Sequence, residues 1–451
     1  MTLEITRRDF IGGAVGATAA MTALPSRAAG IPERPNVLFI LADDLGYGDL
    51  SCYGRPDYDT PVLDRLAARG LKFTSAYAAA PVCTPTRCAF VTGRYPQRLE
   101  VGLEEPLRLV SPPVGLPAGH PTIATLLGAA GYDTALIGKW HLGWRPEFNP
   151  TRHGFQEFFG CLSGSVDYFT HRAPDAGTDI VSGPPDFWEN ETRVEPSGYL
   201  TDLLTERAVQ YVSRPHARPF YLSLHYTAPH SPWEGPDDGA LDHTSHGPGP
   251  MTAGGSRHAF ATMMQSLDAG VGRVLAALKR ARLERDTLVI FTSDNGGERY
   301  SYNWPFSFEK FYLWEGGIRV PAIAYWPGVI AANRTTDQAV ITMDWTATIL
   351  AAAGVSADSA YPLDGESVWP VLTGERGLYE RQLFWRTQTR AAARNGSWKY
   401  VRDGDEEHLY DLRTDLGEKA ELKAAQPDVF ADIKSQYEAW AERMLPRRQP
   451  A

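Results

Sequence analysis

Two pairs of acidic and amide residues in this sequence could together bind a metal ion. Asp43-Asp44 and Asp294-Asn295 each follow directly after a run of apolar residues. Their side chains offer only oxygen ligands, with no His or Cys among them, so they favour Ca²⁺ or Mg²⁺ over zinc or copper. Each pair alone is more typical of a turn whose side chains cap the backbone. Together, after two buried strands, they are better explained as a divalent-cation site.

Two further polar clusters also follow apolar runs. They are Gly138-Lys139-Trp140-His141 and Tyr226-Thr227-Ala228-Pro229-His230. Lysine and histidine side chains can hold an anion or transfer a proton, which suits catalysis on a charged substrate. His141 and His230 could instead be structural histidines whose hydrogen bonds are satisfied. We favour function because both follow strands beside other polar residues, whereas Trp140 and Tyr226 are expected to pack.

The hydrophobic pattern predicts the elements that position these clusters. Apolar runs rich in β-branched and aromatic residues predict buried strands at residues 36–42, 134–137, 220–225 and 288–292. Helical patterns separate them at residues 61–69, 122–130, 199–212 and 259–281. The alternation predicts an α/β fold with a large, mostly parallel sheet sandwiched by helices. Because the carboxyl ends of parallel strands share one edge, the four polar clusters should meet there.

The chain of 451 residues is long enough for a large domain and a smaller appendage. We assign residues 34–373 to a large catalytic domain. Beyond it, short strand-like segments at 382–386, 398–402 and 408–412 precede a final helix at 427–444. This pattern predicts a smaller C-terminal antiparallel subdomain over residues 374–451, closed by an amphipathic helix.

The N-terminal residues 1–29 are typical of a twin-arginine signal peptide. Arg7 and Arg8 precede an apolar run at 11–24 that is too short to span a bilayer, and small residues near Ala28 suit a signal peptidase. A chance arginine pair beside a buried helix is the alternative. We therefore expect export by the twin-arginine translocase to the periplasm or the medium. No second apolar stretch is long enough to embed the mature protein in a membrane, and a net charge of −10 argues against a nucleic-acid partner.

The chain has four cysteines, and Cys83 stands in the most distinctive context. Thr84 is a good N-cap and Pro85 a good first helical residue, so a helix should begin after Cys83 and run toward Thr92. An anion is favoured at such a helix N-terminus, and Arg87 in the next turn could hold an anionic oxygen or a carboxylate. An ordinary capped helix with a buried cysteine is the alternative. The other three, Cys52, Cys88 and Cys161, are typical of small buried apolar residues, and whether they form a disulfide is left open.

The segment Cys83-Thr84-Pro85-Thr86-Arg87, followed by Val91-Thr92-Gly93-Arg94, resembles the modification signature of the formylglycine-dependent (type I) sulfatases. These are the arylsulfatase-like members of the alkaline phosphatase superfamily. The resemblance spans most of the mature chain. Similar motifs lie at residues 35–46, 131–143, 228–230, 294–297, 315–321, 398–400 and 409–412.

The resemblance implies a set of site residues and cofactors. It implies one Ca²⁺ per chain and a 3-oxoalanine (formylglycine) made from Cys83 by a formylglycine-generating enzyme before export. The implied metal ligands are Asp43, Asp44, Asp294, Asn295 and the modified Cys83. The implied catalytic and anion-holding residues are Cys83, Arg87, Lys139, His141, His230 and Lys310, of which Lys139, His230 and Lys310 would contact the substrate. Lys310 is placed by its spacing before Glu315-Gly316-Gly317, although residues 311–314 are bulkier than the small residues usual there.

The implied activity is hydrolysis of sulfate monoesters to an alcohol and sulfate. One hydroxyl of the hydrated aldehyde at position 83 would attack sulfur, with the metal and Asp294 as activators, giving a covalent sulfo-enzyme intermediate. The alcohol would leave with a proton from His230 or Lys310. His141 would then deprotonate the second hydroxyl, which expels sulfate.

Two other activities compete with this interpretation. A phosphatase or phosphonate hydrolase could share the sheet and the metal site, and a catalytically silent sugar-binding protein could keep the Cys83 thiol. The sequence leaves the substrate open among aryl sulfates, sulfated sugars and glycosaminoglycan fragments. The long loops at 172–197 and 234–255 are expected to determine it. Candidate contacts are Ser163 or Ser165, Asp167, His171 and the aromatic residues Tyr168, Phe169, Trp188 and Trp233.

Overall fold

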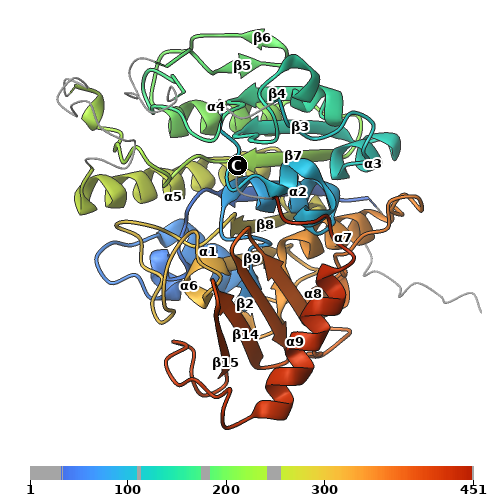
Figure 1. Cartoon of the computed structure of the whole chain (residues 1–451). Helices are drawn as coiled ribbons and strands as arrows, with labels where there is room; N and C mark the ends of the chain where they lie inside the picture. Colours follow the sequence, from blue (N-terminus) through green and yellow to red (C-terminus); the bar gives the residue numbers. More distant parts are fainter. Residues whose placement is uncertain (1–31, 33, 109–112, 174–182, 241–254, 449–451) are drawn as a thin grey trace, which may run out of the picture.

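The computed structural model describes residues 32, 34–108, 113–173, 183–240 and 255–448 (Figure 1). The predicted signal peptide, residues 1–29, lies outside the described residues. So do residues 174–182 and 241–254 of the two predicted substrate loops. Within the described part of the chain, no helix is both long and apolar enough to cross a membrane.

Four parallel strands form the centre of the large sheet. They lie in the order β8-β1-β7-β3, where β1 is Asn36–Ala42, β3 is Asp133–Gly138, β7 is Phe220–His225 and β8 is Thr287–Ser293. These are the four strands predicted from the sequence, and their parallel arrangement is confirmed. Their carboxyl ends therefore share one edge of the sheet.

Seven further strands of the described chain extend this sheet on both sides. On one side, β9 pairs antiparallel with both β8 and β2, so the sheet is mixed but mostly parallel. The added strands are β2 (Leu71–Tyr77), β4 (Glu157–Gly160), β5 (Trp188–Glu189), β6 (Thr192–Arg193), β9 (Arg319–Tyr325), β10 (Arg334–Thr336) and β11 (Val340–Ile341).

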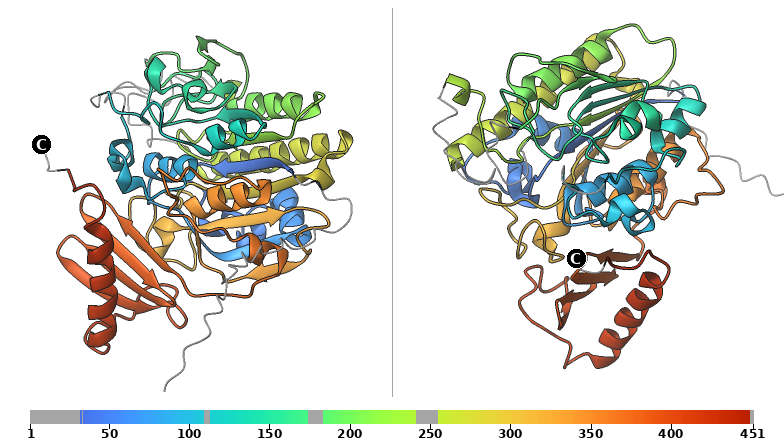
Figure 2. Two further views of the ribbon diagram at one scale, coloured as in Figure 1. Left: turned by 90° about the vertical axis from the view of Figure 1, so that its right-hand side faces the viewer. Right: turned by 45° about the horizontal axis from the view of Figure 1, so that its top comes forward.

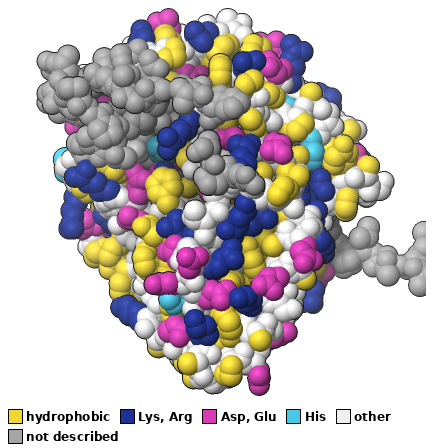
Figure 3. Space-filling model, in the orientation of Figure 1, with side chains coloured by type: hydrophobic (Ala, Val, Ile, Leu, Met, Phe, Trp, Pro, Cys, Tyr) yellow, Lys and Arg dark blue, Asp and Glu magenta, His cyan; other side chains and the backbone are white. Residues whose placement is uncertain are grey.

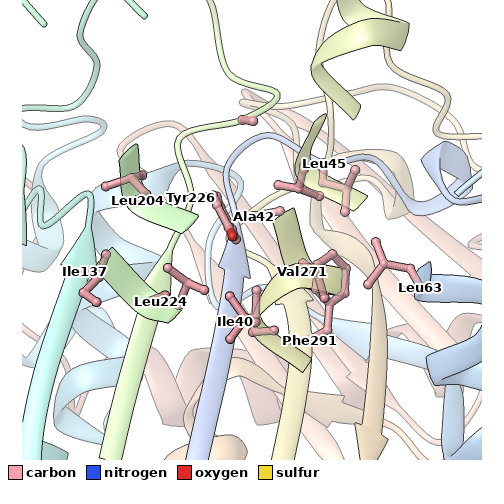
Figure 4. Packing of buried hydrophobic residues seen from close by; sticks show 14 of the residues in the cluster. Ile40, Ala42, Leu45, Leu63, Ile137, Leu204, Leu224, Tyr226, Val271 and Phe291 are labelled. Carbon is pink, nitrogen blue, oxygen red and sulfur yellow. The ribbon is translucent and has the colours of Figure 1, made fainter. Parts of the chain in front are cut away.

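Helices cover both faces of the large sheet. Successive residues of β1 point to opposite faces, so alternate residues pack against the helices of one face or the other. Ile40 and Ala42 pack with α1 (Pro61–Arg69), α4 (Leu200–Ser213) and α5 (Arg257–Arg280), as Figure 4 shows for one core cluster. Phe39 and Leu41 belong to the core on the other face. That core includes residues of α2 (Cys83–Thr92), α3 (Ile123–Ala129), α7 (Thr342–Ala353) and α8 (Trp369–Thr373). The predicted α/β sandwich is confirmed.

Short helical turns complete the large domain. One α-helical turn, α6 (Glu315–Ile318), leads directly into β9. The single-turn 3₁₀ helices are η1 (Tyr47–Asp49), η2 (Ser51–Tyr53), η3 (Pro96–Arg98), η4 (Glu100–Leu103), η5 (Pro146–Phe148), η6 (Pro150–His153), η7 (Asp238–Ala240) and η9 (Glu284–Asp286).

A separate four-stranded antiparallel sheet forms the C-terminal part of the chain. Its strands lie in sequence order, and they are β12 (Gln382–Arg386), β13 (Arg390–Asn395), β14 (Trp398–Asp403) and β15 (Glu406–Asp411). Helix α9 (Pro427–Ala441) packs on one face through Ile433, Tyr437 and Trp440 (Figures 1 and 2). The sequence did not predict β13, and the last helix ends at Ala441 rather than at 444. The domain boundary at 373/374 stays a prediction.

Candidate active site

The four polar clusters meet at the carboxyl edge of the central strands. Backbone hydrogen bonds tie their first residues together: the amide of Asp43 donates to the carbonyl of Ala228 (3.2 Å), and that of Lys139 to the carbonyl of His225 (3.0 Å). The amide of Asp44 donates to Asp294 Oδ1 at 3.2 Å. The convergence predicted from parallel strand ends is therefore present in the structure.

The predicted metal ligands form one buried group of oxygens. Asp43, Asp44, Asp294 and Asn295 are each at most 2% exposed. Ligand atoms of Asp43, Asp294 and Cys83 all lie within 4.8 Å of one another. Two buried oxygens in the group, Asp43 Oδ1 and Asn295 Oδ1, have no hydrogen-bond partner. Because buried polar atoms are almost always paired, these oxygens are suited to bind a cation.

Three buried cationic side chains surround these carboxylates. Lys139 Nζ donates to Asp43 Oδ2 at 2.6 Å, and Lys310 Nζ donates to Asp44 Oδ2 at 2.6 Å. Arg87 Nε donates to Asp294 Oδ2 at 3.0 Å. Three cations thus face the three carboxylates of the predicted metal ligands, and Glu298 adds a fourth carboxylate beside Lys310. An added divalent ion would give the site the positive charge that favours an anionic substrate.

Burial sets the protonation of several groups in this site. Burial, together with the neighbouring Asp43 carboxylate, raises the pKa of Asp294 to about 7. Burial alone would lower the pKa of Lys310, but Asp44 and Glu298 outweigh it and hold the pKa above its usual value. Burial, with help from Lys310, lowers the pKa of His230 to about 3 despite Asp44.

Cys83 is the first residue of helix α2, not the residue before it. The N-cap is Val82, in an extended conformation, and the predicted N-cap Thr84 lies within the helix. The hydroxyl of Thr84 accepts a hydrogen bond from the Leu107 amide at 3.1 Å instead of capping the helix. Cys83 is 1% exposed, and burial raises the pKa of its thiol. All four cysteines are free, which leaves Cys83 available for modification.

The two histidines have different hydrogen-bond partners. His141 Nε2 faces the Leu107 carbonyl at 2.9 Å, and because a carbonyl can only accept, Nε2 carries the hydrogen. His141 Nδ1 is buried with no hydrogen-bond partner, and burial together with Lys139 lowers the pKa of the ring well below its usual value, so this nitrogen carries a free lone pair and no proton. His230 donates from Nδ1 to the Ser231 carbonyl, and its Nε2 lies 3.5 Å from Asp44 Oδ2.

The segment with the two candidate serines borders His141. A Cβ at Gly164 would lie 2.5 Å from Cε1 of the His141 ring, so only glycine fits there without displacing the ring. Ser163 Oγ donates to the Ser165 carbonyl at 2.9 Å. This segment therefore supports the histidine, and which of the two serines touches the substrate stays open.

The other candidate substrate contacts make bonds within the fold. Asp167 Oδ1 accepts from the Phe169 and Thr170 amides, and His171 Nε2 donates to the Gly198 carbonyl. Two of the aromatic candidates, Tyr168 and Trp233, are buried at 1% and 3% exposure. The same holds for Trp140 and Tyr226, which pack as predicted.

Three residues at the site were not singled out from the sequence. His225 contacts Arg87, and its Nδ1 lies 3.4 Å from Arg87 Nη1. Glu298 Oε2 lies 3.6 Å from Lys310 Nζ, and Leu107 supplies the acceptor for His141. A signal existed for two of them, since His225 ends a predicted strand and Glu298 directly follows the Asp294–Gly297 motif. No local pattern marks Leu107.

The surface is not uniformly acidic despite the net charge of −10. Figure 3 shows Lys and Arg side chains gathered near the middle of the face that Figure 1 presents. Near the end of the described chain, Arg386 donates to the Leu445 carbonyl, and Arg448 pairs with Glu104. A local excess of cations can favour an anionic ligand on a protein that is acidic overall.

Comparison with known proteins agrees with the geometry. The Sulfatase family model matches residues 35–355, and the model "N-sulphoglucosamine sulphohydrolase, C-terminal" matches residues 302–442. The chain is 34% identical over 393 residues to N-acetylgalactosamine-6-sulfatase of Homo sapiens, covering 82% of this chain and 72% of the relative. It is 35% identical over 382 residues to human arylsulfatase A, covering 78% of this chain and 71% of the relative.

Solved structures show the same relationship. The structure of Ps i-CgsB in complex with k-i-k-neocarrahexaose superposes with a TM-score of 0.80 at 31% identity, covering 90% of this chain and 92% of that chain. The PsFucS1 sulfatase of Pseudoalteromonas sp. gives a TM-score of 0.76 at 25% identity, covering 92% of each chain. The chain belongs to the sulfatase family and is a sulfuric ester hydrolase.

Proposed function

We propose that this enzyme hydrolyses sulfate esters of saccharides, with Ca²⁺ and a formylglycine formed from Cys83. The observation that carries the proposal is the position of Cys83: its sulfur lies in a buried group with the carboxylates of Asp43 and Asp294. The names of the relatives support the substrate class, since one acts on N-acetylgalactosamine 6-sulfate groups and one solved structure holds a neocarrahexaose.

The acidic group is suited to a calcium ion. Apart from the group at position 83 and the neighbouring His230 ring, it offers oxygens only. Two of those oxygens are buried without a hydrogen-bond partner, and one of them, Asp43 Oδ1, lies 3.4 Å from Arg87 Nη2. Asp43, Asp44, Asp294 and Asn295 would hold the ion together with residue 83. Bound there, Ca²⁺ supplies positive charge that polarises a sulfate oxygen.

Modification of Cys83 would have to precede folding. At 1% exposure the side chain is out of reach of another enzyme in the folded protein. We therefore propose a formylglycine-generating enzyme as a partner during synthesis, before export. Hydrated formylglycine supplies one hydroxyl that attacks sulfur and a second that later expels sulfate.

The chain's own residues hold the substrate and move its protons. Lys139 and Lys310, now paired with Asp43 and Asp44, would turn their ammonium groups to the sulfate oxygens. Lys310 would give the leaving alcohol its proton, because the lowered pKa of His230 leaves its Nε2 without one. His141 would act as the base for sulfate release, because its Nε2–H is held by Leu107 and its Nδ1 is free.

Two measurements test the proposed function. Mass spectrometry of the active protein should show formylglycine, which is lighter than cysteine, in the peptide that contains Cys83. Full activity with an intact thiol would contradict the proposal. Rates should then be compared on N-acetylgalactosamine 6-sulfate, 4-nitrophenyl sulfate and 4-nitrophenyl phosphate. A strong preference for the phosphate would favour a phosphatase instead.

Export by the twin-arginine translocase is a further part of the proposal. It is supported only by Arg7 and Arg8 and the apolar run after them. Replacing both arginines by lysine should leave the enzyme in the cytoplasm of the producing cell. Cell fractionation would locate the enzyme. If the variant is exported as well as the wild type, this route is wrong.

A further inference from the structure

Two exposed phenylalanines flank Lys310, and both have an unusual backbone conformation. Phe308 and Phe311 are 49% and 45% exposed, and their φ angles are +64° and +76°. A bulky residue rarely adopts the left-handed region, and such strain clusters where a side chain is held for a function.

Phe311 is exposed and lies next to the buried active-site residue Lys310. Its amide donates to the Pro81 carbonyl at 2.9 Å, two residues before Cys83. Its ring centroid lies 5.4 Å from Lys310 Nζ, which itself lies 2.6 Å from Asp44 Oδ2. The exposed ring is thus next to the amine that would hold the sulfate group.

The C-terminal subdomain holds Phe311 from the other side. Arg390 of β13 donates from Nη1 to the Phe311 carbonyl at 3.4 Å, and its guanidinium lies over the ring of Tyr312 at 4.5 Å. Phe308 differs, because its ring stacks on Trp314 with the centroids 4.7 Å apart. The ring of Phe308 is therefore used in packing, whereas that of Phe311 faces the site.

We propose that Phe311 is a specificity-determining residue, on whose exposed ring the sugar that carries the scissile sulfate stacks. The inference rests on the proposed function. With the sulfate ester held by Lys310, the carbon skeleton of the alcohol lies beside the Phe311 ring. The apolar C–H face of a pyranose matches an aromatic face, and excluding water from both contributes to binding. The ring thus recognises the alcohol half of the substrate, whereas the cations recognise the sulfate half.

Recognition of the alcohol and recognition of the sulfate can be measured separately in a variant that binds the substrate but cannot hydrolyse it. In a Cys83→Ala background with calcium present, titration calorimetry should be run with N-acetylgalactosamine 6-sulfate and with inorganic sulfate, which has no ring. Adding Phe311→Ala should weaken binding of the sugar sulfate about tenfold and leave inorganic sulfate within about twofold. Phe311→Trp should restore binding of the sugar sulfate. Phe308→Ala is the matched control and should leave the affinity for both ligands unchanged.

Several results would overturn the inference. One is unchanged binding of the sugar sulfate by the Phe311→Ala variant, and another is equal weakening of both ligands, which would place the effect on Lys310. A third is a parent that binds inorganic sulfate but not the sugar sulfate. In a parallel titration with 4-nitrophenyl sulfate, weaker binding of that ligand alone would make an aromatic alcohol the partner of the ring and overturn the inference for a sugar.

Steady-state kinetics keep this inference distinct from the proposed function. In the enzyme that retains Cys83, Phe311→Ala should raise KM for N-acetylgalactosamine 6-sulfate about tenfold with kcat within about twofold, because stacking acts equally on ground and transition states. A loss in kcat at unchanged KM would contradict stacking on the bound substrate. Absence of turnover by the wild-type enzyme would instead contradict the proposed function, while the binding contrast still decides the role of Phe311.

Discussion

A buried ion cluster joins the C-terminal sheet to the catalytic domain and offers a sharp test of the energetics. Lys399 on β14 donates from Nζ to Glu315 Oε1 (2.7 Å) and to Glu418 Oε1 (3.0 Å). All three side chains are at most 5% exposed. Glu315 begins helix α6, five residues after Lys310. The cluster therefore supports the segment that carries Lys310.

Replacing Lys399 by Met keeps most of the side-chain volume and removes the charge. Removing one partner of a buried ion pair typically costs about 3–5 kcal/mol, because the other charge stays buried. Glu315 keeps two partners, Arg319 Nη1 at 2.9 Å and the Tyr77 hydroxyl at 2.6 Å. Glu418 is the carboxylate left without its cation. Burial already raises its pKa to about 7 with Lys399 present, so it will take up a proton, and we expect a loss near 3 kcal/mol.

Urea unfolding at neutral pH measures this loss, with two variants as controls. Lys434→Met breaks a partly buried pair with Glu407, 2.8 Å apart, which still contacts solvent, so the variant should cost under about 1 kcal/mol. The double variant Lys399→Met/Glu418→Gln should regain part of the loss, because no buried carboxylate is left unpaired. The reasoning from buried charge is wrong if the free energy of unfolding of Lys399→Met lies within about 1 kcal/mol of the wild-type value. It is also wrong if the double variant is less stable than Lys399→Met.

Four further predictions concern the site and its surroundings. Cys83→Ser should accumulate a covalently sulfated enzyme or lose activity, as intact-mass spectrometry and turnover assays would show, since a serine has no second hydroxyl. Gly164→Ala should push a Cβ against the His141 ring, 2.5 Å away, and lower kcat about 10–100-fold. Unfolding assays should show a loss of stability of about 1–3 kcal/mol with the protein still folded. Chelation of divalent ions should abolish activity and lower the unfolding temperature, and both should return with Ca²⁺. Burial and Asp167 raise the pKa of Glu234 from 4.5 to about 8. The folded state therefore holds the Glu234 proton more tightly than the unfolded state, so this group stabilises the fold fully below pH 4.5 and loses that effect as pH rises toward 8. The free energy of unfolding should consequently fall less between pH 5 and pH 9 for Glu234→Gln than for the wild type.

The central strands were predictable because each is a continuous apolar run buried on both faces. Two further strands of the same sheet were not, for physical reasons. In β2, Lys72 and Thr74 interrupt the apolar residues, since this strand is only partly buried on one side. β9 contains Pro321, which cannot donate to a neighbouring strand and is typical of edges and bulges. In the fold, β9 pairs antiparallel with both its neighbours.

The start of helix α2 shows a limit of local rules. Thr84 and Pro85 form a strong local signal for a helix start, and that signal predicted Cys83 outside the helix. The Thr84 hydroxyl instead accepts from Leu107, which is 23 residues away in the sequence. A competitor for a capping hydroxyl that comes from another loop is not visible in the local pattern. Cys83 therefore enters the first turn, among the backbone N–H groups that favour an anion.

Predictability of the site follows from how each residue is held. Asp43, Lys139 and Asp294 follow parallel strands, so the sheet alone brings them together. The segment of Lys310 has no such strand: its own amide donates to the Gly297 carbonyl, and the next amide donates to Pro81. Spacing within a resemblance could identify this lysine, but only the folded loops show that the bulky residue after it is exposed at the site. The groups that act on the sulfate can thus be predicted from strand ends, whereas those that face the alcohol depend on loop contacts between distant parts of the chain.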